Sequence, residues 1–313
     1  MYAYILRRIL TTVPVMGVVA VAVFLLLHLT PGDPATVIAG DYAQPEDIAR
    51  IRAQLGLDQP LYIQFFTWIG AVLSGDLGVS IFSNLPVTKL IGQRLEPTLA
   101  LAVATIVFAV VIAVPLGVIA AWRAGTFTDR AIMVFSVLGF SVPVFVIGYA
   151  MMWGLSLKLG WFPVQGYKPI AEGFGPFLRS IALPTIALGI IYIALIARIT
   201  RASVLEVLTE DYIRTARAKG LDNRTLLIRH ALKNAAVPIV TIIGIGIALL
   251  IGGVVVTESV FNIPGLGRLT IDSVLRRDYP VIQGVILLFS FVFVVVNLLI
   301  DLSYTVLDPR IRY

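Results

Sequence analysis

Histidine and cysteine, the side chains that most often ligate metals or act as bases and nucleophiles, are scarce in this chain. Its 313 residues include two histidines and no cysteine. His28 lies near the end of the first apolar segment and His230 lies in a polar stretch far along the chain, so no histidine pair can ligate a metal or assist a serine. We interpret His28 as an interfacial side chain and His230 as part of the polar face of a loop helix. The sequence therefore predicts no catalytic site, no metal site and no enzyme activity of the chain's own.

Charged side chains within apolar segments would indicate an ion-coupled carrier, because burying such groups in a membrane is costly and is kept for function. The five later apolar segments, as bounded below, contain no Asp, Glu, Lys or Arg. Glu258 and Asp301 lie just beyond two of them, and we expect both to be interfacial charges. The chain also lacks a Gly-x-x-x-x-Gly-Lys-Ser/Thr phosphate loop. An ion-coupled carrier or channel is therefore a distant alternative, and any coupling to ATP requires a separate ATPase.

Composition places the chain among polytopic membrane proteins, because 58% of its residues are hydrophobic and only 13% are charged. Six apolar segments are candidates to cross a bilayer as helices. They cover residues 9–29, 98–122, 131–157, 181–197, 235–257 and 279–300. A cleaved signal peptide is the alternative for the first segment, but its apolar run is longer than a usual signal core and no convincing cleavage site follows. We predict an all-α protein with six transmembrane helices.

The basic character of the chain follows its predicted topology. The formal net charge is +6, which could indicate a nucleic-acid partner. Six spans place both termini on one side of the membrane, together with residues 198–238, here called the polar loop. Lys and Arg are in excess on that side, so the positive-inside rule places it in the cytoplasm. No nucleic-acid partner is needed to explain the charge.

Residues 30–96 form a long polar insertion that carries its own helix signals. A helix is predicted to begin at Pro45 and to end near Gly56, with Ile51 on its apolar face. A second is predicted from Leu61 to Leu73. The two helices suggest a small cap outside the membrane, and a loop that only packs on the spans is an equally good interpretation.

The polar loop carries the signals of two short helices. Thr209 is predicted to cap a helix of about ten residues with an acidic first turn, and Gly220 to end it in a left-handed conformation. Asp222 is predicted to cap a second helix that runs through Leu232. Small residues next to the bulky Tyr212 suit entry into a partner's cleft. A solvated basic loop that only fixes topology is the alternative.

The polar loop resembles the EAA loop of ABC importer permeases. Ala216, Gly220 and Leu232 match the general EAA pattern, and Arg214 to Gly220 followed by Arg229 to Ala235 resembles its dipeptide, oligopeptide and nickel branch. Further stretches resemble signature segments of the first, B-type permease subunit of that branch. They are residues 32–34, 55–61, 75–78, 260–268, 277–281 and 307–312. These segments cover the chain nearly end to end.

This resemblance implies a type I ABC importer permease fold of the MetI-like kind, with six transmembrane helices. Residues 1–29 would hold the N-terminal tail and first span, and residues 30–96 a helical extracytoplasmic insertion. Residues 97–313 would form the permease core, with its coupling loop at 198–238.

The resemblance also implies partners. They are a second, homologous permease subunit, two ABC ATPase subunits that use ATP and Mg²⁺, and an extracytoplasmic solute-binding protein. The chain itself would bind no cofactor and would be a multi-pass protein of a bacterial or archaeal cytoplasmic membrane, with both termini in the cytoplasm. Peptides are the expected cargo, and glutathione, a nickel chelate or another small solute are the alternatives.

Site residues follow from the resemblance and from side-chain type. The ATPase-coupling residues are predicted to be Tyr212, Ile213, Arg214, Thr215, Ala216, Arg217, Ala218, Lys219, Gly220 and Leu221. Thr241, Gly244, Thr257 and Glu258 are candidates to line the pathway, although small residues there also suit close helix packing. Ile51 and Phe65 are candidates for docking the binding protein.

Overall fold

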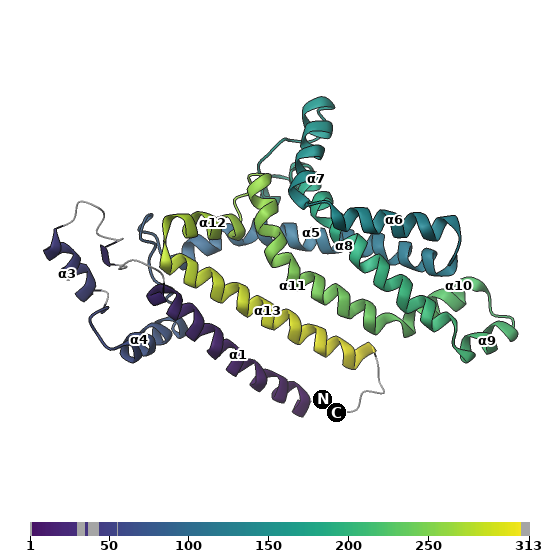
Figure 1. Ribbon diagram of the computed structural model, residues 1–313, viewed down its shortest axis with the longest axis horizontal. Coiled ribbons are helices and arrows are strands. Elements are labelled where there is room, and N and C mark those ends of the chain that lie inside the picture. The colour runs from purple at the N-terminus through teal and green to yellow at the C-terminus, as the bar shows by residue number, and fades with distance from the viewer. Residues whose placement is uncertain (1, 30–34, 37–43, 55, 308–313) are drawn as a thin grey trace. The chain divides into compact units, whose positions relative to one another are not determined.

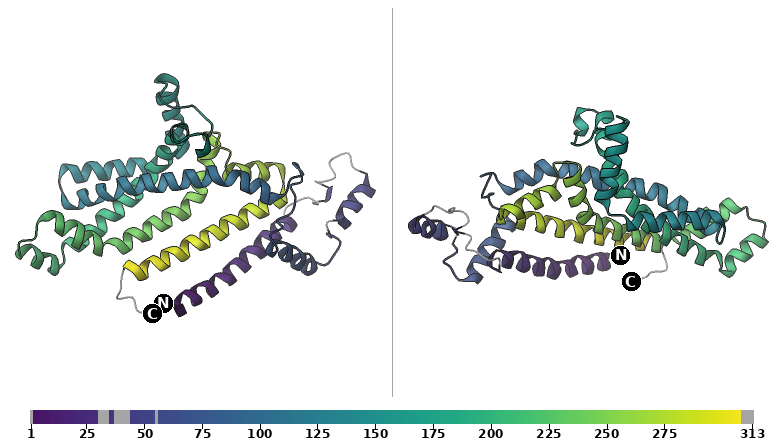
Figure 2. Two further views of the ribbon diagram at one scale, coloured as in Figure 1. Left: turned by 180° about the vertical axis from the view of Figure 1, so that it is seen from behind. Right: turned by 45° about the horizontal axis from the view of Figure 1, so that its top comes forward.

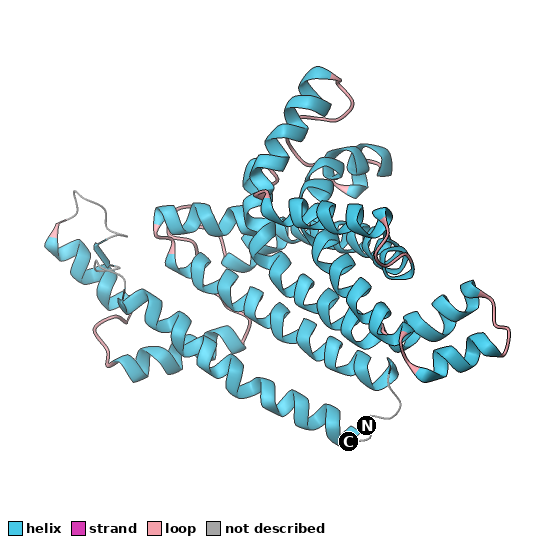
Figure 3. Cartoon of the chain, turned by 45° about the vertical axis from the view of Figure 1, so that its right-hand side comes forward, coloured by secondary structure: helices cyan, strands magenta, loops and turns pink. Residues whose placement is uncertain are grey.

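The computed structural model of the chain describes residues 2–29, 35–36, 44–54 and 56–307, and in these ranges it is helical and contains no strand (Figure 3). The described chain divides into two compact units. The first unit comprises Met1–Leu95 and Leu269–Val295, and the second comprises Glu96–Arg268 and Val296–Tyr313. Each unit is described here by itself.

Figure 1 shows the described helices in their order along the chain. In order they are α1(Tyr2–Leu29), α3(Pro45–Gln54), α4(Leu61–Leu73), α5(Val87–Trp122), α6(Phe127–Ser141), α7(Val144–Met151), η1(Met152–Lys158), η2(Ile170–Glu172), α8(Phe174–Leu208), α9(Asp211–Ala218), α10(Asn223–Thr225), η3(Leu226–Leu232), α11(Ala236–Val260), α12(Leu266–Arg276) and α13(Tyr279–Leu307). The predicted helix over residues 61–73 is confirmed, and the helix predicted to begin at Pro45 is confirmed as α3.

In the first unit, α1 and the first half of α13 run side by side (Figure 2). Ala20 and Val23 of α1 pack with Leu287 of α13, and apolar side chains of α4 complete this cluster. Gln64 of α4 faces His28, with 3.0 Å between Gln64 Oε1 and His28 Nε2. His28 therefore serves as a polar contact between α1 and α4, in keeping with the structural role expected from the sequence.

In the second unit, α8 is the central helix. Its residues from Phe177 to Val204 include many that are fully buried against α5, α7 and α11. Gly117 of α5 meets α8 where a methyl group would overlap Thr200 and the Ala197 carbonyl. The backbones of α5 and α8 therefore approach closely, as small residues allow in helix packing within membranes.

The segment predicted as a third span, residues 131–157, is not one straight helix. It is divided into α6 and the α7–η1 pair, which are bent by 99°. The break falls at Val142, which is extended with φ −90° and ψ 125°, and at Pro143. Proline lacks an N–H group and disfavours the helical conformation of the residue before it, so a continuous helix cannot pass this point without a cost.

Membrane-spanning candidates account for most of the second unit and part of the first. In the described part of the chain, three helices are long and apolar enough to cross a membrane, and two bent pairs raise the number to five by length and composition. In α1 the described apolar helical stretch, Leu10–Leu26, is shorter than the stretches of those helices. The six-span count stays a prediction. Helix α5 begins at Val87, eleven residues before the span expected from hydropathy.

Candidate functional site

Of the coupling residues expected from the sequence, Tyr212 to Ala218 lie on α9, a short helix that closely follows the end of α8 (Figure 1), and Lys219, Gly220 and Leu221 come after it. Only Thr209 and Glu210 separate the two helices. The expectation that Thr209 caps α9 was wrong, because the Thr209 hydroxyl donates to the Glu206 carbonyl at 2.7 Å and ends α8. Glu210 takes the extended N-cap position instead. Helix α9 thus continues from the most buried helix of its unit.

One side of α9 is anchored and the other is exposed. Ile213 is 1% exposed and packs inward, while Arg214 and Thr215 lie on the surface. Partial burial of the ring raises the pKa of Tyr212, which also shares a side-chain hydrogen bond with Asn234. The exposed residues next to a buried anchor give α9 a fixed base and a free outer face.

A glycine ends α9 as the sequence predicted. Gly220 has φ +83°, a left-handed conformation that side chains with a Cβ rarely adopt. Its N–H donates to the Arg217 carbonyl at 3.0 Å, and the Leu221 N–H reaches the Ala216 carbonyl at 3.3 Å. These bonds satisfy carbonyl groups at the helix end, as expected of a glycine C-cap.

The segment after Gly220 differs in part from the predicted second helix. Asp222 caps it as expected, accepting a hydrogen bond from the Thr225 N–H at 3.0 Å. Hydrogen bonds from the Thr225 side chain and backbone lower the pKa of the Asp222 carboxyl. Only Asn223–Thr225 is α-helical, and η3(Leu226–Leu232) is a π-helical turn, a form often found at functional sites.

The sequence favours an i,i+4 ion pair between Glu210 and Arg214, but in the structure Arg214 pairs with Asp211, three residues before it. Arg214 Nη1 lies 3.2 Å from Asp211 Oδ1, and both side chains are well exposed. A pair of this kind stabilises a helix by about 0.2–0.5 kcal/mol. It therefore adds little to the stability of α9, whose anchor is Ile213.

A buried ion pair near this site was not foreseen from the sequence. Asp129, in the first turn of α6, has a side chain only 5% exposed. Arg201 of α8 binds it through two hydrogen bonds, Nε to Oδ1 at 2.5 Å and Nη2 to Oδ2 at 2.7 Å. The one available signal was that each residue lies at the edge of an apolar segment and that their charges are opposite.

The four candidate pathway residues lie on α11 and are largely packed inside the second unit. The Thr241 hydroxyl donates to the Val237 carbonyl at 2.7 Å, within the helix. A methyl group on Gly244 would overlap Ile300, so this glycine allows close packing. Thr257 and Glu258 are buried. Their role in a pathway stays a prediction.

Glu258, expected from the sequence to be an interfacial charge, is enclosed by the protein. It is fully buried in the last turn of α11. Its carboxylate accepts hydrogen bonds from the Thr98 hydroxyl at 2.5 Å and from the Arg268 N–H at 3.0 Å. Thr98 also accepts from the Leu266 N–H at 2.8 Å. Glu258 thus joins the end of α11 to α5 and α12 within this unit.

Two glycines make room for the Glu258 carboxylate. A methyl group on Gly265 would overlap both oxygen atoms, and one on Gly267 would overlap the Val255 backbone. We call Glu258, Thr98, Gly265 and Gly267 the glutamate cradle. The sequence signal for it was the glycine-rich stretch 260–268, which resembled a family signature segment.

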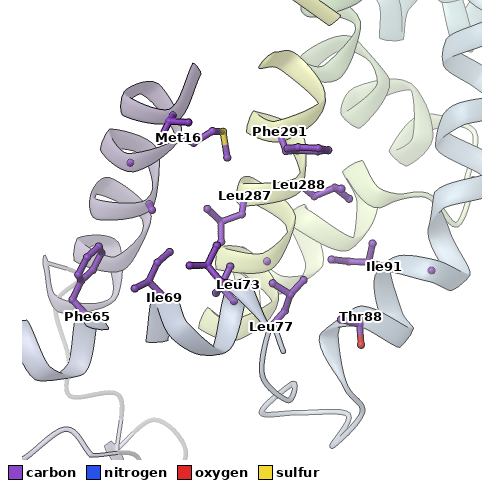
Figure 4. A pocket seen from close by; sticks show the side chains of 16 residues that line it. Met16, Phe65, Ile69, Leu73, Leu77, Thr88, Ile91, Leu287, Leu288 and Phe291 are labelled. Atoms are coloured by element: carbon purple, nitrogen blue, oxygen red, sulfur yellow. The ribbon is translucent and has the colours of Figure 1, made fainter. Parts of the chain in front are cut away.

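The two candidate docking residues lie in the first unit. Ile51 is part of α3. Phe65 of α4 packs against Phe24 with ring centroids 5.4 Å apart, and it lines an apolar pocket of about 650 Å³ (Figure 4). Met16, Ile69 and Leu287 line the same pocket. Phe65 therefore faces the interior of its unit, and its docking role stays a prediction.

In the described part of the chain, no group of three or more His, Cys, Asp or Glu side chains could hold a metal ion. Helix α9 presents an exposed face that is acidic in its first turn, at Asp211, and basic in its last turn, at Arg217, on a base fixed by Ile213.

Comparisons with known proteins agree with these features. The model of the family described as "Binding-protein-dependent transport system inner membrane component" matches residues 113–313, and the model of its N-terminal region matches residues 1–102. A probable peptide ABC transporter permease of Sinorhizobium fredii is 54% identical over 313 residues, which covers all of both chains. The glutathione transport system permease GsiC of Salmonella choleraesuis is 45% identical over 314 residues and is also covered in full.

The fold matches solved structures as well. An inward-facing structure of the MetNI methionine ABC transporter aligns with 70% of this chain and 96% of its own, at a TM-score of 0.58 and 19% identity. This likeness confirms the predicted MetI-like permease fold. Together these matches show that the chain belongs to the family of binding-protein-dependent transport system inner membrane components, the permease subunits of ABC importers.

Proposed function

We propose that this permease translocates di- and oligopeptides delivered by an extracytoplasmic solute-binding protein, with energy from ATP hydrolysed by partner subunits. In this proposal it pairs with a second, homologous permease and two ABC ATPases. Its termini and the polar loop lie in the cytoplasm. The ATPases use Mg²⁺ and ATP, and this chain holds neither.

The observation that carries the proposal is the form of α9. A helix meant to transmit force must be held at its base and open to a partner on its other face. Ile213 supplies the base, and the exposed Arg214, Thr215 and Ala218 supply the open face. Because α9 continues from α8, a displacement of α9 reaches the buried centre of its unit through one helix and a two-residue turn.

Peptide cargo is supported by the names of similar permeases. Relatives from Sinorhizobium fredii and Brucella abortus are described as peptide transport permeases, at 54% and 44% identity. Glutathione, itself a short peptide derivative, is the second candidate because GsiC is 45% identical over its full length.

The test is reconstitution. The tagged permease is purified in mild detergent with its co-purifying subunits, which are identified by mass spectrometry, and the complex is placed in liposomes with its binding protein. We expect ATP-dependent uptake of labelled di- or tripeptides, competed weakly by glutathione. Uptake of glutathione but not of peptides would favour the second candidate. A lone permease that purifies without ATPase subunits would contradict the proposal.

A further inference from the structure

Two contacts join the turn between α5 and α6 to the segment that carries α9. The turn comprises Arg123–Thr126, and its flanking residues Trp122 and Asp129 make the contacts. We propose that Trp122, this turn and Asp129 form a brace, which makes α5 and α6 move with α9. The inference rests on the proposed function of α9 and extends the coupling machinery to residues outside the polar loop.

The first contact is the ion pair between Asp129 and Arg201. Its two hydrogen bonds fix the guanidinium plane against the carboxylate, so the pair resists rotation as well as separation. Arg201 lies in the last two turns of α8, close in sequence to the start of α9. The pair therefore connects the first turn of α6 to the part of α8 that leads into α9.

Asp129 also fixes the shape of the turn. Its Oδ2 accepts a hydrogen bond from the Gly125 N–H at 2.9 Å, and Gly125 has φ +79°. The Thr126 hydroxyl donates to the Arg123 carbonyl at 2.6 Å. One carboxylate thus binds the turn and α8 at once, so the turn cannot shift relative to α8 without breaking a hydrogen bond.

The second contact lies on α9 itself. The Arg217 guanidinium carbon is 5.7 Å from the centre of the Trp122 ring, a distance at which a cation is attracted to an aromatic face. Trp122 is the last residue of α5. The end of α5 is thus linked to the last turn of α9, while Asp129 is linked to α8 at Arg201, ten residues before α9 begins.

A third feature prevents α5 and α8 from sliding along each other. Gly117 of α5 leaves no room for a methyl group against Ala197 and Thr200 of α8. Thr200 is the neighbour of Arg201 in sequence. Close backbone contact at Gly117 and polar contact at Asp129 together make α5, the turn and α8 a single body next to α9.

The transport test uses the complete complex in liposomes and measures peptide imported per ATP hydrolysed. We expect Asp129→Asn to lower this ratio about fivefold or more, within the range of typical coupling effects. The double variant Asp129→Arg with Arg201→Asp should move the ratio back toward wild type. Glu172→Gln, which removes the exposed Lys168–Glu172 pair, is the matched control and should leave the ratio unchanged.

A pair that only stabilises the fold would give a different result. It would lower the amount of assembled complex but leave import per ATP equal to wild type, and that outcome would overturn the proposal. If Asp129→Asn does not assemble, Trp122→Leu tests the second contact, with Trp122→Phe as the variant that retains an aromatic face. An unchanged ratio in Trp122→Leu would likewise count against the brace.

A second measurement needs no transported substrate. Because the chain has no cysteine, spin labels can be placed at Ala124→Cys in the turn and Glu210→Cys at the start of α9. We expect one inter-label distance with and without trapped ATP, and a nucleotide-dependent distance once Asp129→Asn is added. A distance that already changes with ATP in the unmodified background would overturn the brace. Failure of peptide uptake with a constant distance would instead reject the proposed cargo.

Discussion

Asp129 and Glu258 are both buried carboxylates of the second unit, yet the protein holds them in two different ways. Asp129 is bound by the guanidinium of Arg201 in a two-bond ion pair, next to the exposed turn Arg123–Thr126. Glu258 lies in the glutamate cradle, where two glycines leave just enough room for its oxygens. Asp129 lies beyond the C-terminal end of α5, seven residues after Trp122, whereas Glu258 bonds to Thr98 in the first third of α5, toward its other end.

The two carboxylates show two ways of fixing neighbouring helices, one through charge and the other through close packing. The Asp129 end is held mainly by charge-assisted hydrogen bonds, which depend on both partners remaining ionised. The Glu258 end is held by shape as well as by hydrogen bonds, because a single added methyl group would collide with the carboxylate. The end near α9 should therefore respond to charge substitutions, and the other end to changes of volume.

The largest loss of folding stability is expected from Gly265→Ala. The added methyl group would overlap the buried Glu258 carboxylate, and overpacking together with a lost hydrogen bond should cost about 2–4 kcal/mol. Thermal unfolding of the detergent-purified protein measures it. Gly70→Ala, where the methyl group meets no atom within 4 Å, is the control and should be neutral or slightly stabilising. Equal melting temperatures for the two variants would contradict the conclusion that close packing around the Glu258 carboxylate stabilises the protein.

A smaller loss of folding stability is expected from Asp129→Asn. Breaking a buried pair is costly, but Arg201 keeps 26% of its side chain exposed and can be partly solvated, so we expect about 1–3 kcal/mol. A double-mutant cycle with Arg201→Gln in the same unfolding assay isolates the pair energy. If the losses of unfolding free energy in the two single variants add up to the loss in the double variant, the ion pair does not stabilise the contact between α6 and α8.

Gly220→Ala tests backbone shape at the α9 end. The substitution forces a side chain into φ +83° and should cost about 1 kcal/mol. Because this strain lies at the end of α9, hydrogen exchange should increase in α9 and leave α11 unchanged. Gly220→Pro, which cannot adopt this φ, should in addition uncouple ATP hydrolysis from uptake. Normal ATP-driven uptake by the proline variant would contradict the coupling role of α9.

The smallest effect is expected from pH at the Asp222 cap. The folded pKa of this carboxyl is lowered, so its stabilising contribution is complete above the unfolded pKa of about 3.9 and is lost as the pH falls through the folded pKa. Hydrogen-exchange protection at Thr225 should therefore fall only in acid below about pH 4. Asp222→Asn should abolish that acid dependence, and a persistent dependence in this variant would assign it to another group.

The sequence predicted the local elements well where one residue type determines them. Leu61–Leu73 was bounded correctly because a proline precedes it and an apolar run fills it. Gly220 and Asp222 ended and capped helices as expected, since both act through neighbouring backbone groups. The break at Pro143 was missed because a hydropathy pattern averages over a proline inside an apolar run.

Long-range contacts could not be predicted in this way. Asp129 and Arg201 are 72 residues apart, and nothing in either local segment specifies the other as a partner. Glu258 was expected at a membrane interface because it follows an apolar run. Its burial depends on Thr98, 160 residues earlier, and on an N–H group ten residues later. The sites at the ends of α5 are thus products of tertiary packing.

The glutamate cradle also has a consequence for the order in which the protein is assembled. Helix α11 is synthesised with Glu258 near its end, but the Leu266 and Arg268 N–H groups, which donate to Thr98 and Glu258 of the cradle, emerge from the ribosome only afterwards. Thr98 must already be in place from α5, which was made much earlier. A nascent chain released between residues 260 and 266 would lack the Arg268 N–H that donates to the carboxylate and the Leu266 N–H that donates to Thr98. Completion of this short segment therefore marks the point at which the newly inserted α11 can be fixed against α5.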